Sequence, residues 1–346
     1  MGTEIQIAQI QNIPLVINIL KVLATGLLSF VLAFLLTPLW THILYKYKLG
    51  IKIKETSVDG DKLTVVSKLH AGKSGTPTMG GVIIWATILI LVLASHYLFP
   101  LIATWTDTNF IARLDFFKRS QVWLPLFVLI TAGILGLFDD YMSVRGKGGN
   151  KGGGMRFALR FWWLFAIAGA GAWWFYSKLG WDQIHVPALG DFSIGWWYIP
   201  LFIFVILFTA ISSNETDGLD GLNGGVLLIA FSSFVLIAFM QNKMDLAAFC
   251  AAVSGALMAF LWFNIHPARF FMGDTGAISL GTTLGVVAML TNSALVLFII
   301  VFIYSLESGS AAIQLFSKRF FKRKVFLAAP LHHHFEAKGW PEPKIV

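Results

Sequence analysis

Long apolar runs alternate with short polar stretches along the whole 346-residue chain. With their flanks, nine runs are long enough to cross a membrane as helices: residues 15–45, 80–103, 121–141, 157–177, 195–213, 222–241, 245–264, 276–292 and 293–316. A spanning helix needs about 20 mostly apolar residues. The pattern predicts an all-α, polytopic membrane bundle that forms one domain over residues 1–346.

The composition supports this prediction. The chain is 57% hydrophobic and 13% charged, whereas soluble domains carry about 25% charged residues. It has one cysteine, Cys250, so an intramolecular disulfide is excluded. The net charge of +8 does not indicate a nucleic-acid partner, because the basic residues are concentrated in particular loops.

The distribution of basic residues predicts the topology. Twenty of the 26 Lys and Arg residues follow odd-numbered spans. Because cytoplasmic loops carry an excess of Lys and Arg, this places the N-terminus outside. The predicted cytoplasmic loops are 46–79, 142–156, 212–223, 264–276 and 317–346. These loops also hold the glycine-rich, acidic and histidine-rich stretches, so we expect the active site on the cytoplasmic face.

The stretch 214–225 joins two apolar runs and carries three acids and two amides. Read as a helix, it places four polar residues at every third position on one face: Asn214, Asp217, Asp220 and Asn223. Acids at the end of a membrane span are costly to bury, so they indicate function.

Two further loops combine features of anion or metal sites. Lys73, Thr78 and several glycines precede the second span, where backbone N–H groups and a helix N-terminus can bind an anion. The spacing is not that of a nucleoside-triphosphate-binding loop, and a flexible loop with a helix cap is the alternative. Asp139 and Asp140 repel each other at the end of the third span, which favours Mg²⁺ or Lys nearby. A solvated helix end is the alternative there.

The last two loops add an acid, aromatic rings and imidazoles. Asp274 either caps the eighth span or holds a metal or phosphate at that helix N-terminus. Phe270 and Phe271 offer a flat surface on which a base can stack. The imidazoles of 332–334 are consecutive, unlike spaced zinc ligands, so we expect them to bind phosphate while oxygen ligands hold Mg²⁺.

The final predicted span, 293–316, is unusual because its second half is polar. Small residues between Ser305 and Gln314 permit a kink or close packing. Glu307 either faces a groove or pairs inside the bundle. Taken together, the motifs predict a phosphate-rich, Mg²⁺-dependent reaction at the membrane surface, with a lipid as one substrate.

The chain resembles the phospho-N-acetylmuramoyl-pentapeptide transferases, a family among the polyprenyl-phosphate N-acetylhexosamine-1-phosphate transferases. The resemblance rests on five ordered motifs: Gly75-Thr-Pro-Thr-Met-Gly-Gly81, Asp139-Asp140-Tyr141, Asn214 to Asn223, Asn264 to Gly276 and Pro330-Leu-His-His-His-Phe-Glu336. It covers the chain from the first span to its last residue.

The resemblance implies transfer of phospho-MurNAc-pentapeptide from UDP-MurNAc-pentapeptide to undecaprenyl phosphate, giving lipid I and UMP. It also implies Mg²⁺, a homodimer and a multi-pass location in the bacterial inner membrane. A sibling transferase that uses UDP-GlcNAc is the alternative of the same class. An ion-coupled secondary transporter is less favoured, because the acids cluster at helix ends and the chain shows no internal repeat.

The resemblance also implies roles for individual residues. Asp139, Asp140 and Asp274 are the implied metal-binding and catalytic acids, and Asp139 either deprotonates or places the lipid phosphate. His332, His333 and His334 are the implied catalytic histidines that contact the diphosphate. The implied substrate-binding residues are Lys73, Thr78, Lys147, Lys151, Asn214, Asp217, Asp220, Asn264, Phe271, Glu307 and Gln314.

The sequence departs from the family pattern in two places. Ser143 stands where relatives often carry a third acid, so a full aspartate-rich metal motif is not expected. The family usually has a tenth span after Pro-Glu-Pro, whereas the given sequence ends at Val346, so we expect either that the sequence is truncated or that this helix is missing from it.

Overall fold

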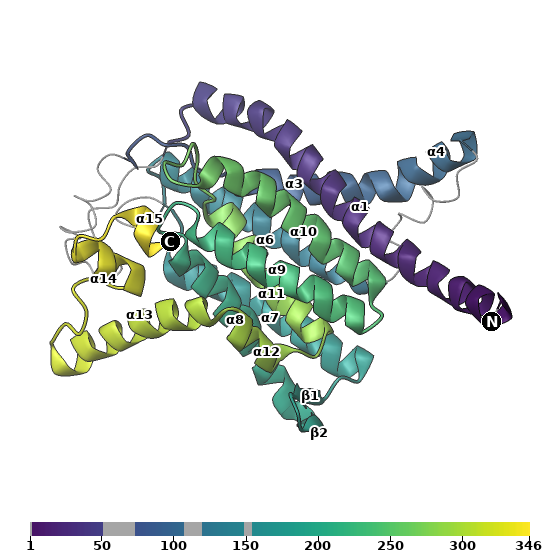
Figure 1. Cartoon of the computed structure of the whole chain (residues 1–346). Helices are drawn as coiled ribbons and strands as arrows, with labels where there is room; N and C mark the ends of the chain where they lie inside the picture. The colour runs from purple at the N-terminus through teal and green to yellow at the C-terminus, as the bar shows by residue number, and fades with distance from the viewer. Residues whose placement is uncertain (1, 51–72, 107–119, 149–153) are drawn as a thin grey trace.

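The computed structural model describes residues 2–50, 73–106, 120–148 and 154–346. The chain forms a helical bundle (Figure 1). Its helices are α1 (Gly2–Lys46), α3 (Gly81–Leu93), the π-helix η2 (Ala94–Leu98), α4 (Phe99–Thr106), α6 (Ser120–Val144), α7 (Phe157–Leu179), the 3₁₀-helix η3 (Gly195–Trp197), α8 (Tyr198–Thr216), α9 (Leu222–Met240), α10 (Met244–Asn264), α11 (Asp274–Leu290), α12 (Ala294–Ile300), α13 (Phe302–Phe321), α14 (Leu331–Ala337) and α15 (Glu342–Ile345).

Every predicted span coincides with a helix or a run of helices, and the chain is a multi-pass membrane protein. Among the described residues, six helical stretches are long and apolar enough to cross a membrane, or seven if α12 and α13 form one broken span. The predicted span 157–177 is the 23-residue helix α7, whose four Trp residues and two basic residues make it less apolar. The predicted span 276–292 is α11, with 17 residues.

Helix α11 lies at the centre of the bundle (Figure 1). All of its residues from Thr275 to Leu290 are buried, and it packs against α6, α8 and α3. Two glycine contacts bring its N-terminus close to neighbouring helices: Gly81 of α3 meets Gly276, and Gly136 of α6 meets the backbone of Asp274. A side chain at either glycine would clash with backbone, so the absence of a Cβ sets the helix spacing.

The last predicted span, 293–316, is broken, as its small residues permit, but not where they lie. Helices α12 and α13 are bent by 83° at a break between Ile300 and Phe302. Small residues at 305–314 suggested a kink within the polar half, but the break lies at Val301, where the apolar half ends. Helix α13 therefore leads away from α12 toward α14 (Figure 1).

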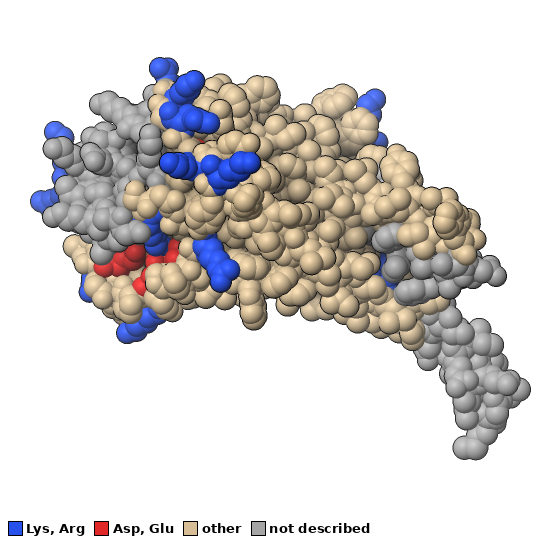
Figure 2. Space-filling model, turned by 90° about the horizontal axis from the view of Figure 1, so that it is seen from above, with Lys and Arg blue, Asp and Glu red and all other residues tan. Residues whose placement is uncertain are grey.

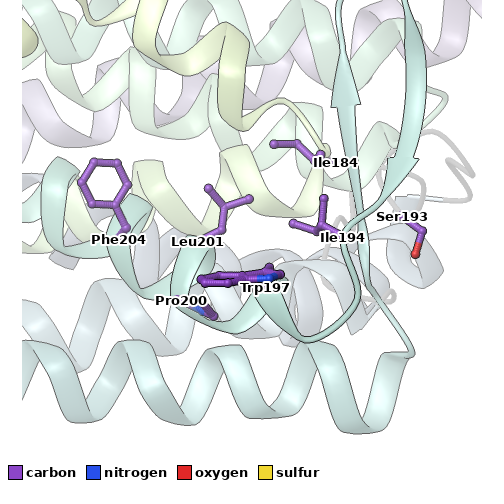
Figure 3. A pocket seen from close by; sticks show the side chains of 7 residues that line it. All are labelled: Ile184, Ser193, Ile194, Trp197, Pro200, Leu201 and Phe204. Carbon is purple, nitrogen blue, oxygen red and sulfur yellow. The ribbon is translucent and has the colours of Figure 1, made fainter.

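The purely helical prediction also misses a small β-hairpin between α7 and α8. Strands β1 (Gln183–Val186) and β2 (Gly190–Ser193) pair antiparallel. Beside the hairpin is a pocket of about 690 Å³, whose lining includes Ile184, Trp197 and Phe204 (Figure 3). This pocket adjoins the N-terminal end of α8, whereas Asn214 lies near its C-terminal end.

Charged side chains are unevenly distributed over the face in Figure 2. Lys and Arg gather toward the left end, and the visible Asp and Glu of the described residues also lie there. The middle of this face shows neither sign of charge. An uncharged band beside a basic end is the surface expected of a membrane protein whose polar site lies at one end.

Candidate active site

The site begins at the N-terminus of α11, which is capped by a side chain from another helix. Both carboxylate oxygens of Asp140 accept backbone hydrogen bonds, from the N–H groups of Asp274 at 3.1 Å and Thr275 at 3.0 Å. The first N–H groups of a helix lack partners within it, so a buried carboxylate there satisfies them. Asp140 thereby fixes the position of Asp274.

Asp139 and Asp274 are joined by one cation. The Arg160 Nη1 atom lies 3.2 Å from Asp139 Oδ2 and 2.6 Å from Asp274 Oδ2. Asp139 also accepts a 2.6 Å hydrogen bond from the Met155 N–H, and Asn214 Nδ2 donates to Asp274 Oδ1. The three predicted metal-binding acids are thus brought to one place by α6, the start of α7 and the start of α11.

The stretch 214–225 is not one helix, which corrects the helical reading of its polar face. Helix α8 ends at Thr216, and α9 begins at Leu222 after a turn in which Gly221 has φ 84°. Asp217 lies in the turn and accepts a 3.1 Å hydrogen bond from the Gly273 N–H. Burial of its carboxyl, followed by the negative charge of Asp274, raises the pKa of Asp217 to about 7.

Asp220, at the other end of the turn, is the centre of a second polar cluster. Its Oδ1 lies 2.8 Å from Lys73 Nζ, and its Oδ2 lies 3.0 Å from His266 Nδ1 and accepts the Ala268 N–H at 3.1 Å. Burial opposes ionisation of Asp220, but these partners outweigh burial and lower the pKa of its carboxyl. Glu342 of α15 completes the cluster, with Oε1 2.6 Å from Lys73 Nζ.

The predicted base-binding residues surround this second cluster. The Lys73 ammonium lies 5.7 Å from the centre of the Phe271 ring, which is partly exposed, whereas Phe270 is buried against Phe260. Asn264 is buried and links two segments, because Oδ1 accepts the Gly221 N–H and Nδ2 donates to the Phe270 carbonyl. Only Phe271 of the aromatic pair is therefore open to a ligand.

The predicted histidines lie on the short helix α14. His332 is buried, and its Nδ1 lies 2.9 Å from Glu307 Oε2 of α13, while its Nε2 has no hydrogen-bond partner among the described residues. A Cβ at Gly218 would clash with that Nε2. His333 Nδ1 lies 2.6 Å from Glu336 Oε2. The inward-facing pair is thus Glu307 with His332.

Three other predicted residues lie outside these two clusters. His334 Nδ1 accepts the Leu327 N–H. The side chain of Gln314 bonds to the backbone of Val325 and Phe326, so it holds the segment that leads into α14. Lys147 is exposed, and Lys151 lies outside the described residues.

The residues around Asp140 fit Mg²⁺ by chemistry. Their side-chain donors are oxygens, as Mg²⁺ prefers. The Thr78 Oγ1 is buried without a hydrogen-bond partner among the described residues. A Cβ at Gly273 would lie 2.6 Å from that oxygen and against Asp140 Oδ2, so glycine leaves space beside both oxygens. Asp139, Asp140, Asp274 and Thr78 are the residues that would hold the ion, which would have to displace Arg160 from between Asp139 and Asp274. As they stand, the three carboxylates do not bring ligand atoms within 4.8 Å of one another.

Comparison with known proteins identifies the family. The profile of glycosyl transferase family 4 matches residues 122–292, and phospho-N-acetylmuramoyl-pentapeptide-transferase signature 1 matches residues 73–84. A phospho-N-acetylmuramoyl-pentapeptide-transferase of Chloroflexus aggregans is 35% identical over 345 residues, which are 96% of this chain and 86% of that protein. This chain belongs to the phospho-N-acetylmuramoyl-pentapeptide transferases. The chain is also similar to proteins of the same name from two further bacteria. The relative from Geobacillus thermodenitrificans is 35% identical, over 92% of this chain and 90% of the relative. The relative from Bacillus subtilis is 34% identical, over 94% of this chain and 92% of the relative.

Three residues of this transferase are brought into the site by the fold but are not predicted from the sequence. Arg160 enters the sequence analysis only as one of the basic residues that predict the topology, although it joins Asp139 to Asp274. His266 and Glu342 were not singled out, although both contact the Asp220 cluster. Each lies far in sequence from its partner, so spacing alone carried no signal.

Proposed function

We propose that this chain transfers phospho-MurNAc-pentapeptide from UDP-MurNAc-pentapeptide to undecaprenyl phosphate, forming lipid I and UMP. The observation that carries the proposal is the family match over nearly the whole chain. The two polar clusters support it, since one is rich in oxygen ligands and the other combines a lysine with an aromatic ring. We place the reaction on the cytoplasmic face of the bacterial inner membrane, where the basic loops are expected.

The acid cluster is the proposed phosphoryl-transfer centre. Mg²⁺ bound there would neutralise diphosphate oxygens and polarise the phosphorus that is attacked. Asp274 is the principal proposed ligand, placed by the cap from Asp140 and by the bond from Asn214. Asp139 accepts the proton of the lipid phosphate or orients that phosphate for in-line attack. Arg160 holds the two carboxylates together and limits their repulsion.

The second cluster is the proposed donor site. Phe271 stacks against uracil, while Lys73 and Asp220 offer a donor and an acceptor beside the ring. His332, kept in place by Glu307, faces the turn that joins the two clusters. His333 and His334 complete the proposed diphosphate side. We also propose that the enzyme works as a homodimer, as the family resemblance implies.

The test uses the purified protein with undecaprenyl phosphate, Mg²⁺ and UDP-MurNAc-pentapeptide, followed by chromatography for lipid I and UMP. We expect both products in equal amounts, and none after EDTA is added in excess. Readdition of Mg²⁺ should restore turnover. A protein that binds both substrates in a native state but forms neither product would refute the proposed activity.

A further inference from the structure

Glu342 occupies an unexpected place in the donor site. It comes from α15, more than 260 residues after Lys73, yet its side chain is only 9% exposed. One oxygen, Oε1, lies 2.6 Å from Lys73 Nζ and also accepts the Asp220 N–H. The other, Oε2, lies 3.3 Å from His266 Nδ1. A single carboxylate therefore joins three separate loops.

The cluster is an ion-pair network in which a lysine occupies the position of a cation. Ligand atoms of Asp220, His266 and Glu342 lie within 4.8 Å of one another, as they do in metal sites. However, Lys73 Nζ lies within 2.8 Å of Asp220 and 2.6 Å of Glu342. Its charge compensates the two carboxylates, so the cluster as it stands is an ion-pair network.

The two carboxylates hold Lys73 from two sides. A lysine side chain has four rotatable bonds and loses much rotamer freedom when it is fixed. Asp220 and Glu342 together restrict the ammonium to a position 5.7 Å from the centre of the Phe271 ring. An isolated contact with Asp220 would leave the ammonium free to swing about that carboxylate.

We propose that Glu342 is a positioning residue of the donor site, which acts through Lys73. It fixes the Lys73 ammonium beside Phe271 and ties the C-terminal segment to the turn at Asp220, so that the nucleotide meets a preorganised pocket. The role rests on the proposed function, because it assigns Lys73 to recognition of the uridine nucleotide. Preorganisation lowers the cost of ordering the site when the ligand binds.

The test is a double-mutant cycle on the full-length protein. Glu342→Gln keeps an oxygen for the Asp220 N–H but removes the charge that holds Lys73. We expect it to weaken UMP binding, measured by calorimetry, about tenfold, the size of a coupling between contacting residues. In turnover, KM for the donor should rise by a similar factor, while kcat and KM for the lipid stay within about twofold.

Non-additivity separates positioning from a merely structural role. Because Glu342 acts through Lys73, the double variant Lys73→Gln/Glu342→Gln should bind UMP no more weakly than Lys73→Gln alone. The matched control is Lys344→Gln on the same short helix, whose ammonium contacts Trp340 instead of the cluster. It should bind UMP like the wild type.

A substrate-free measurement makes the inference independent of turnover. The rate of acylation at Lys73, measured by mass spectrometry, should rise in Glu342→Gln because the amine is released. Unchanged Lys73 reactivity, or UMP affinity equal to or tighter than that of the wild type, would overturn the proposal. If the wild type makes no lipid I but Glu342→Gln still loses UMP affinity, the transferase assignment fails and the role of Glu342 stands.

Discussion

Replacing Asp140 tests whether this acid works mainly by building the start of α11. In the structure, both of its oxygens accept N–H groups at the N-terminus of that helix, and its side chain is buried. Asp140→Ala removes the cap and leaves two backbone donors, at Asp274 and Thr275, without a partner. We therefore expect loss of stability together with loss of activity, since Asp274 loses the contact that places it.

The magnitude follows from the two hydrogen bonds. A hydrogen bond contributes about 0.5–1.5 kcal/mol net, and a buried donor left unsatisfied costs about 1–3 kcal/mol. Allowing for relaxation and water entry, Asp140→Ala should lower the free energy of unfolding by about 3 kcal/mol. Asp140→Asn keeps one carbonyl oxygen and should lose about half as much.

The assay is thermal and chemical unfolding of the detergent-solubilised protein, run beside turnover. Asp191→Asn is the control, because that carboxylate is exposed on the hairpin and pairs with His185 at the surface, where ion pairs contribute about 0–1 kcal/mol. The reasoning is refuted if Asp140→Ala unfolds like the wild type, because a dispensable carboxylate cannot be the cap.

Three further substitutions probe the site. Asp274→Asn should abolish Mg²⁺-dependent turnover while the unfolding midpoint changes little, and near-normal rates would exclude Asp274 as the metal ligand. Gly218→Ala should reduce kcat at least tenfold, because a Cβ there would displace His332; an unchanged kcat would show that the contact is unimportant. The folded-state pKa of Asp217, raised to about 7, means that the folded protein retains a proton there that the unfolded chain has released. The free energy of unfolding should therefore fall as pH rises from about 4 to 7, because the folded protein must then give up the proton on Asp217. Asp217→Asn should remove this pH dependence. An unaltered pH dependence in the variant would contradict the raised pKa of Asp217.

Much of the architecture could be predicted from apolar runs, because a lipid environment leaves few alternatives to helices. The break at Val301 could not, since no proline or glycine marks it and the bend depends on where α13 packs. The turn at 217–221 was also misread, because polar residues at every third position fit a helix as well as two helix ends. In the turn, Gly221 has a positive φ, and Asp217, with ψ 43°, already lies outside the helical range.

The residues of the site could be predicted only in part from the sequence. The family resemblance groups Asp139, Asp140 and Asp274, and the fold brings them together, but nothing in the sequence indicates that Asp140 caps α11. The roles of Arg160 and Glu342 cannot be predicted from the sequence, for the same physical reason. An ion pair between residues distant in the chain depends on tertiary packing, and neither residue belongs to a periodic pattern.

Competition between two donors tests the central proposal most directly. The purified protein is given undecaprenyl phosphate, Mg²⁺ and equal concentrations of UDP-MurNAc-pentapeptide and UDP-GlcNAc. The lipid products are then identified by their mass in mass spectrometry. We predict lipid I with stoichiometric UMP and no GlcNAc-linked lipid. A GlcNAc-linked lipid formed in place of lipid I would contradict the account.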